Sequence, residues 1–147
     1  MFAAIDTNVL VYAEGAGDER RKRLARALLV RLADDRTVVP VQVLGELYQV
    51  LVGKYRVSAE LAEEALLRWS EVFQVRGSSW SALSSALALA RAHQLAIWDS
   101  LIICVAAEHR CKVLLSEDLQ EGFSWSGVTI VNPFAARPHA LLEELLA

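Results

Sequence analysis

The sequence predicts an α/β fold: a three-layer α/β/α sandwich around a central, mostly parallel sheet of about five strands. Short apolar runs of strand length alternate along the chain with longer segments whose apolar residues recur at helical spacing. The strand-like runs are continuously apolar, which is typical of parallel strands covered on both faces. The 147 residues have the length of one domain and contain no linker-like stretch. We therefore expect a single domain over residues 1–147.

The first half of the chain alternates between strand and helix. Residues 2 to 5 (FAAI) predict a buried strand, and residues 8 to 13 predict a helix that ends at a glycine-rich turn. Apolar residues at helical spacing predict a second helix over residues 19 to 34. Residues 37 to 40 (TVVP) predict the second strand, and the helical period that follows extends from residue 43 to about residue 55.

The second half repeats this alternation. Ser58 is placed to cap a helix that ends near residue 70, and the apolar run VFQV at residues 72 to 75 predicts a third strand. A serine in RGSSW caps the next helix, and a further helix begins near Asp99. The last predicted elements are strands at residues 113 to 116 and 128 to 131 and a short helix within PHALLEELLA.

Composition excludes several classes of protein. Hydrophobic residues make up 54% and the mean hydropathy is +0.31, which is too apolar for a disordered chain and predicts that some surface is buried against a partner. The net charge of −3 and pI near 5.6 give no overall signal for nucleic-acid binding. Any such contact must be local, and the basic run ERRKRLAR is equally well explained as a solvated helix face.

The cellular compartment is predicted from the lack of a signal peptide and of a membrane-spanning segment in the sequence. No Lys or Arg precedes Arg20, so the opening does not resemble a signal peptide. No uncharged apolar run approaches the roughly 18 residues that cross a bilayer. Cys104 and Cys111 have no second pair of ligands to complete a zinc site, so we expect reduced structural thiols. We expect a soluble, cytoplasmic protein without membrane contact.

Four acidic residues stand where parallel sheets place functional sites. Asp6 follows the first predicted strand and Asp118 the fourth, Asp99 begins a helix, and Glu46 lies about one and a half turns into the helix after the second strand. Sites in open parallel sheets form beyond the carboxyl ends of the strands, so these four residues are candidates to meet there. Each also has a structural explanation as a helix cap, a turn residue, an acceptor at a strand end or a partly exposed helix residue.

Clustered carboxylates need compensation. Two unit charges about 4 Å apart repel by roughly 4 kcal/mol at an effective dielectric near 20. No Lys or Arg lies within several residues of Asp6, Glu46 or Asp99, so a bound cation or protonation must offset the charge. Oxygen-only ligands suit Mg²⁺ or Mn²⁺. Such ions support hydrolysis of phosphodiesters, because one ion activates a water and polarises the phosphoryl group while a second stabilises the leaving oxygen.

Four short stretches carry a family resemblance. They are DTNVLVYA from Asp6, VPVQVLGELYQVL around Glu46, IWDSLIICVA around Asp99 and LLSEDLQEG around Asp118. In this order they resemble the PIN-domain ribonucleases, especially VapC-type toxins, over nearly the whole chain. The resemblance implies a Mg²⁺- or Mn²⁺-dependent endoribonuclease whose catalytic and metal-binding acids are Asp6, Glu46, Asp99 and Asp118.

The resemblance also implies supporting roles and partners. Asn8 and Ser116 match polar positions that support the acids or the substrate phosphate, and Thr7 accompanies them. The family pattern favours Asp118, two residues after Ser116, over Glu117, which is then a bystander or a secondary ligand. Toxins of this kind imply an RNA substrate, a homodimer and a small cognate antitoxin whose tail enters the active-site groove.

Two other classes compete with a nuclease. A haloacid-dehalogenase-like phosphatase also places a nucleophilic aspartate after its first strand, but it needs a second aspartate two residues on, where this chain has Asn8. A non-catalytic binding domain of the same fold would leave the four acids without a task. Trp98, beside Asp99, either lines a substrate groove or packs under the helix N-terminus.

Overall fold

One six-stranded sheet organises the molecule, with the strand order β3-β2-β1-β4-β6-β5. The computed structural model describes residues 1–32 and 34–147. The strands are β1 (Phe2–Ile5), β2 (Thr37–Pro40), β3 (Gln74–Arg76), β4 (Cys111–Leu115), β5 (Ser124–Trp125) and β6 (Val128–Val131). Neighbouring strands from β3 to β6 pair in parallel, and β5 pairs antiparallel with β6. The predicted α/β class and mostly parallel sheet are confirmed.

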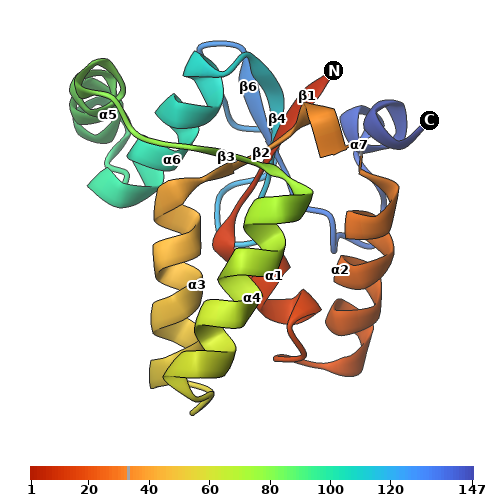
Figure 1. Cartoon of the computed structure of the whole chain (residues 1–147). Coiled ribbons are helices and arrows are strands. Elements are labelled where there is room, and N and C mark those ends of the chain that lie inside the picture. The colour runs from red at the N-terminus through yellow and green to blue at the C-terminus, as the bar shows by residue number, and fades with distance from the viewer. Residues whose placement is uncertain (33) are drawn as a thin grey trace.

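Helices cover both faces of this sheet. They are α1 (Thr7–Ala13), α2 (Glu19–Arg31), α3 (Val41–Gly53), α4 (Ala59–Val72), α5 (Trp80–His93), α6 (Ile97–Glu108) and α7 (Ala140–Leu146), with a short 3₁₀ helix, η1 (Asp34–Arg36). The chain crosses in one direction from β1 to β3 and returns from β3 to β4, so right-handed connections place α1 to α4 on one face and α5 and α6 on the other. Figure 1 shows these two groups on opposite sides of the sheet.

Burial of the strands explains their continuous apolar sequences. β2 is buried along its whole length, and β1, β4 and β6 are buried at all but one position each. These four strands are central and are covered by helices or neighbouring strands, whereas β3 and β5 form the edges and are partly exposed. Parallel central strands therefore lack the alternating pattern of a sheet with one wet face.

Local sequence signals located most of the helix starts. The Ser58 side chain accepts a hydrogen bond from the Leu61 backbone N–H, and Ser79 accepts one from Ala82, so both predicted serine caps are present. The predicted start near Asp99 is slightly late, because α6 begins at Ile97.

The sequence misplaced several element boundaries and missed one strand. Residues 72 to 75 were predicted as a strand, but Val72 ends α4 and β3 starts at Gln74, because a short apolar run does not distinguish a helix end from an edge strand. The helix predicted over residues 19 to 34 ends at Arg31; Ala33, within that prediction, lies outside the described residues. The two-residue strand β5 brings the sheet to six strands and was not predicted.

The register of β1 against β4 positions the candidate site. Ile5 pairs with Leu115 at the carboxyl ends of the two strands, and the Asp6 backbone N–H donates to the Leu115 carbonyl at 3.0 Å. Asp6 and Ser116 therefore leave the sheet side by side. Within the described residues, no helix is both long and apolar enough to span a bilayer.

Candidate active site

Asp6 occupies the point where β1 ends and α1 begins. The residue is 8% exposed, and its backbone is extended, as expected at the N-cap of α1. Its Oδ1 accepts a 2.7 Å hydrogen bond from the Thr7 backbone N–H, and its Oδ2 accepts a 2.7 Å bond from the Ser116 hydroxyl. Both oxygens are thus held in place, because a buried carboxylate is tolerated only with hydrogen-bond partners or compensating charge.

No ion pair of the described residues involves the Asp6 carboxyl. Its pKa is raised from 3.8 to about 6, mainly by burial and to a smaller extent by the negative charges of Glu46 and Asp99. Hydrogen bonds from Ser116 and Thr7 oppose this rise, since they favour the ionised form. The contribution from Glu46 and Asp99 shows that the fold brings these acids near Asp6.

Glu46 is held from both sides. It lies in the middle of α3, where its Oε2 accepts a 2.6 Å hydrogen bond from the Thr7 hydroxyl and its Oε1 accepts a 2.9 Å bond from the Gln42 amide. Gln42 precedes Glu46 by one helical turn, so the two side chains share a face of α3. The same Gln42 nitrogen donates to the Trp98 carbonyl at 3.1 Å, which ties α3 to the first turn of α6.

Asp99 is the least restrained of the four acids. It lies in the first turn of α6 and is partly buried, and no described residue donates a hydrogen bond to its carboxylate. Ala96 is the N-cap and forms no side-chain cap bond, so Asp99 does not cap this helix. Burial raises the pKa of Asp99, and the charges of Glu46 and Asp118 add to the rise. Asp99 thus lies near the other acids and neither caps the helix nor accepts a hydrogen bond from a described residue.

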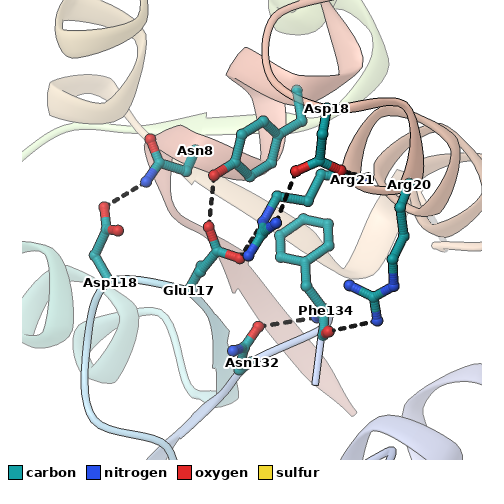
Figure 2. A network of polar contacts seen from close by, with 9 residues as sticks. Asn8, Asp18, Arg20, Arg21, Glu117, Asp118, Asn132 and Phe134 are labelled. Carbon is teal, nitrogen blue, oxygen red and sulfur yellow. Dashed lines mark hydrogen bonds and ion pairs between the residues drawn. The ribbon is translucent and has the colours of Figure 1, made fainter. Parts of the chain in front are cut away.

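The two neighbouring acids after β4 face different partners. The Asn8 amide donates a hydrogen bond to Asp118 Oδ2, whereas Glu117 accepts hydrogen bonds from the Tyr12 hydroxyl at 2.5 Å and from Arg21 Nε at 2.6 Å. Figure 2 shows the Glu117 side chain beside Arg21 and the Asp118 side chain beside Asn8. Burial and the charge of Glu117 raise the pKa of Asp118, while the Asn8 hydrogen bond lowers it.

The predicted supporting residues each hold one acid. Ser116 donates to Asp6, Thr7 donates to Glu46 and Asn8 donates to Asp118. The structure therefore brings together all seven residues that the sequence singled out. Among the ion pairs of the described residues, none involves Asp6, Glu46, Asp99 or Asp118, so the charge of this four-acid cluster is not neutralised by a side-chain cation.

The donor chemistry of the cluster fits a hard divalent ion. All candidate ligands are carboxylate oxygens. The pKa values of Asp6, Asp99 and Asp118 are raised mainly by burial and further by neighbouring carboxylates, and a bound cation would favour their ionised forms. In the described part of the chain, no three acids already stand in metal-coordinating geometry. Mg²⁺ usually keeps several waters and needs only one or two direct carboxylate ligands.

Three residues of the site were not predicted as such. Gln42 orients Glu46, and its position one helical turn earlier in VPVQVLGELYQVL was the available signal. Tyr12 lies within the first motif, and Arg21 lies within the basic run. Nothing in their local sequence indicated a contact with Glu117, which is 105 and 96 residues away from them, respectively.

Comparison with known proteins assigns the chain to a family. The model of the PIN domain family matches residues 3–123, and the chain belongs to the PIN-domain family. A comparison with curated protein sequences gives no match.

Solved structures with the same fold include bacterial toxins. VapC20 of Mycobacterium tuberculosis, described as a sarcin-ricin loop cleaving toxin, is 20% identical, with a TM-score of 0.67 over 79% of this chain and 89% of that chain. A toxin-antitoxin complex from Klebsiella pneumoniae is 21% identical, with a TM-score of 0.63 over 89% and 97% of the two chains. VapBC2 of Rickettsia felis, bound to promoter DNA, is 16% identical, with a TM-score of 0.64 over 88% and 97%. At these identities the likeness establishes the fold.

Proposed function

We propose that this protein is a Mg²⁺- or Mn²⁺-dependent endoribonuclease and the toxin of a type II toxin-antitoxin pair. The observation that carries the proposal is the convergence of Asp6, Glu46, Asp99 and Asp118 without a neutralising side-chain cation. Membership of the PIN-domain family and the toxins among its structural neighbours support the same conclusion. The proposed RNA substrate and protein antitoxin are both expected in the cytoplasm, so we propose that the protein acts there.

The residues divide the work of phosphodiester hydrolysis. The divalent ion, when bound, polarises the phosphoryl group and lowers the pKa of the attacking water. Asp6, fixed by Ser116 and the start of α1, and Asp99, free of other partners, would hold the ion. Glu46, oriented by Thr7 and Gln42, would accept a proton from the attacking water. Asp118, which is exposed, would add negative charge to the cluster.

The phosphatase alternative is disfavoured by the role of Asn8. That chemistry requires an acid at this position to protonate the leaving group. Here the Asn8 amide donates a hydrogen bond to Asp118 and has no acidic proton to transfer, so it acts as a neutral support for a carboxylate.

An apolar groove supplies a surface for the antitoxin. It has a volume of about 340 Å³ and is lined by residues of α1, α2, η1 and α4, namely Ala13, Arg26, Leu29, Val30, Asp34, Trp69 and Val72. Val30 is 87% exposed there and adjoins the other apolar residues of the groove, so it is part of an exposed apolar patch. A toxin-antitoxin complex among the neighbours supports a protein partner for this chain, and we propose that the cognate antitoxin covers this groove.

A homodimer is the proposed assembly of the protein itself. Trp80 is 74% exposed and Trp98 is 60% exposed, each in the first turn of its helix. Large exposed aromatic side chains are typical anchors of protein interfaces. Light scattering of the purified protein tests this assembly, and a monomer at micromolar concentration would contradict it.

The decisive experiment compares cleavage of single-stranded RNA by wild type and by Asp6→Asn. Cleavage should require Mn²⁺ or Mg²⁺, stop with EDTA and fall at least about 100-fold in the variant, because an amide cannot replace a charged ligand. Glu63→Gln removes an exposed acid of α4 outside the cluster and is the matched control, expected to cut at the wild-type rate. Equal activity in Asp6→Asn and wild type would refute the proposal and point to a contaminating nuclease.

A further inference from the structure

Glu117 is withdrawn from the four-acid cluster by two residues from another part of the fold. Both of its carboxylate oxygens are engaged, Oε1 by the Tyr12 hydroxyl at 2.5 Å and Oε2 by Arg21 Nε at 2.6 Å. Its neighbour Asp118 is turned instead toward Asn8 (Figure 2). Glu117 and Asp118 are adjacent and both acidic, but only Asp118 remains with the four-acid cluster. Their different tertiary contacts cause this difference.

Arg21 is itself fixed in place. Its Nη1 contacts Asp18 Oδ2 at 2.7 Å, and its backbone N–H donates to Asp18 Oδ1 at 2.8 Å, which is the capping bond at the start of α2. The Glu117 side chain is 17% exposed, whereas that of Asp18 is 52% exposed. The pair with Glu117 is thus the more shielded of the two, and ion pairs shielded from water interact more strongly than surface pairs.

We propose that Arg21 is a positioning residue, which neutralises Glu117 and holds it away from the metal site so that Asp118 alone completes the cluster. The proposal rests on the proposed function. It gives a role to a cation, Arg21, that lies outside the four stretches that carry the family resemblance. Tyr12 assists, because its hydroxyl occupies the second Glu117 oxygen.

Glu117 needs a neutralising partner because of its negative charge and the length of its side chain. The charge of Glu117 already acts on Asp118, where it contributes to a raised pKa. Without Arg21, Glu117 would be a fifth uncompensated acid on a longer side chain than Asp118. A divalent ion gains affinity from an added carboxylate, but an ion drawn toward Glu117 is displaced from the position set by Asp6. Removal of Arg21 should therefore strengthen ion uptake while slowing cleavage.

Arg21 could instead bind the RNA phosphate directly, and the contacts favour the positioning role. Its Nε and Nη1 are already committed to Glu117 and Asp18. A phosphate could reach only the remaining N–H groups of the guanidinium, whose orientation is already fixed by Glu117 and Asp18. The two roles differ in one prediction: a residue needed only to control Glu117 becomes dispensable when Glu117 is neutral.

A double-mutant cycle with the full-length protein separates the two roles. The variants are Arg21→Gln, Glu117→Gln and the double variant, and the readouts are kcat on single-stranded RNA and Mn²⁺ binding by calorimetry. Arg21→Gln should lower kcat about tenfold and tighten Mn²⁺ binding about threefold, whereas Glu117→Gln should remain close to wild type. The double variant should recover kcat to within about threefold of wild type.

Arg20→Gln is the matched control. Arg20 is the adjacent cation on α2, and its Nη2 donates to the Phe134 carbonyl at 2.8 Å instead of to an acid (Figure 2). Its loss should change neither kcat nor Mn²⁺ binding, although it removes the same charge from the same helix.

Each contrary result has a separate meaning. A double variant as slow as Arg21→Gln would show that Arg21 acts on the substrate and would overturn the positioning role. Loss of Mn²⁺ affinity together with kcat in Arg21→Gln would show a general structural role and would also overturn it. A wild-type protein that neither cuts RNA nor binds Mn²⁺ would refute the proposed function, and this inference with it.

Discussion

The Thr7 hydroxyl donates a 2.6 Å hydrogen bond to Glu46 Oε2 and so connects the first residue of α1 with the middle of α3. The bond is part-buried and ends on a charged acceptor, which makes it stronger than a bond between neutral groups. Thr7 also follows Asp6 directly, so one short segment supplies an acid and the support of a second acid.

Replacement of Thr7 by Val should release Glu46 on one side. We expect kcat to fall about tenfold and the free energy of unfolding to fall by about 1 to 2 kcal/mol, because a buried acceptor loses its donor. Thr7→Ser keeps the hydroxyl and should retain both quantities. RNA cleavage and urea unfolding measure the two effects, and a Val variant as active as Thr7→Ser would contradict this role.

The Asp6 carboxyl should make stability depend on pH in the absence of metal. Its pKa is about 6 in the folded protein and 3.8 in the reference state, so the folded state holds the proton more tightly. The stabilisation is complete below pH 4 and is lost as the pH rises through 6, a change of about 3 kcal/mol for about two pKa units. Urea unfolding in EDTA should show this decrease in wild type relative to Asp6→Asn.

Two further observations test that assignment. Glu63→Gln, which alters an exposed acid, should keep the wild-type pH dependence. Mn²⁺ should restore stability above pH 6, because a bound cation favours ionised Asp6. Parallel pH profiles for wild type and Asp6→Asn would exclude Asp6 as the source.

Asp99 should contribute to ion binding more than to folding. It has no hydrogen-bond donor among the described residues, so Asp99→Asn should leave the metal-free protein as stable as wild type or more stable, by relieving repulsion from Glu46 and Asp118. Saturating Mn²⁺, at about 100 times its Kd, should stabilise wild type by about 2.7 kcal/mol and the variant much less. Thermal unfolding with and without Mn²⁺ makes the comparison.

Asn8→Asp should harm activity more than Asn8→Ala. The Asn8 amide donates to Asp118, and an aspartate would replace this donor with a second negative charge. We expect cleavage to fall about tenfold in the alanine variant and further in the aspartate variant. A gain of phosphomonoesterase activity in Asn8→Asp would instead revive the phosphatase alternative.

Val30→Glu should prevent binding of the antitoxin. Val30 is 87% exposed in the groove between α2 and α4, and a buried glutamate without a partner opposes association. Co-expression with a candidate antitoxin, followed by copurification, tests this effect. Leu87→Glu on α5 is the control, because Leu87 is also exposed but lies on the other face of the sheet. Equal capture by both variants would show that the groove is not the docking surface.

Local patterns were sufficient to predict the succession of strands and helices. The capping serines Ser58 and Ser79 act within three residues of their own position, so a single sequence contains the whole interaction. The buried runs of β1, β2 and β4 are likewise continuous in sequence. The edge strands were harder: β3 was misplaced by two residues and β5 was missed, because short, partly exposed strands depend on a neighbour for their pairing.

The sequence by itself determined which acids were available and at which end of the sheet they would stand, because chain direction in a parallel sheet decides where each strand ends. Only the tertiary structure decided which partners Glu117 and Asp118 contact. Their partners, Arg21 and Asn8, lie 96 and 110 residues away along the chain. The direction of a carboxylate depends on these packed partners, and no local period or cap encodes them.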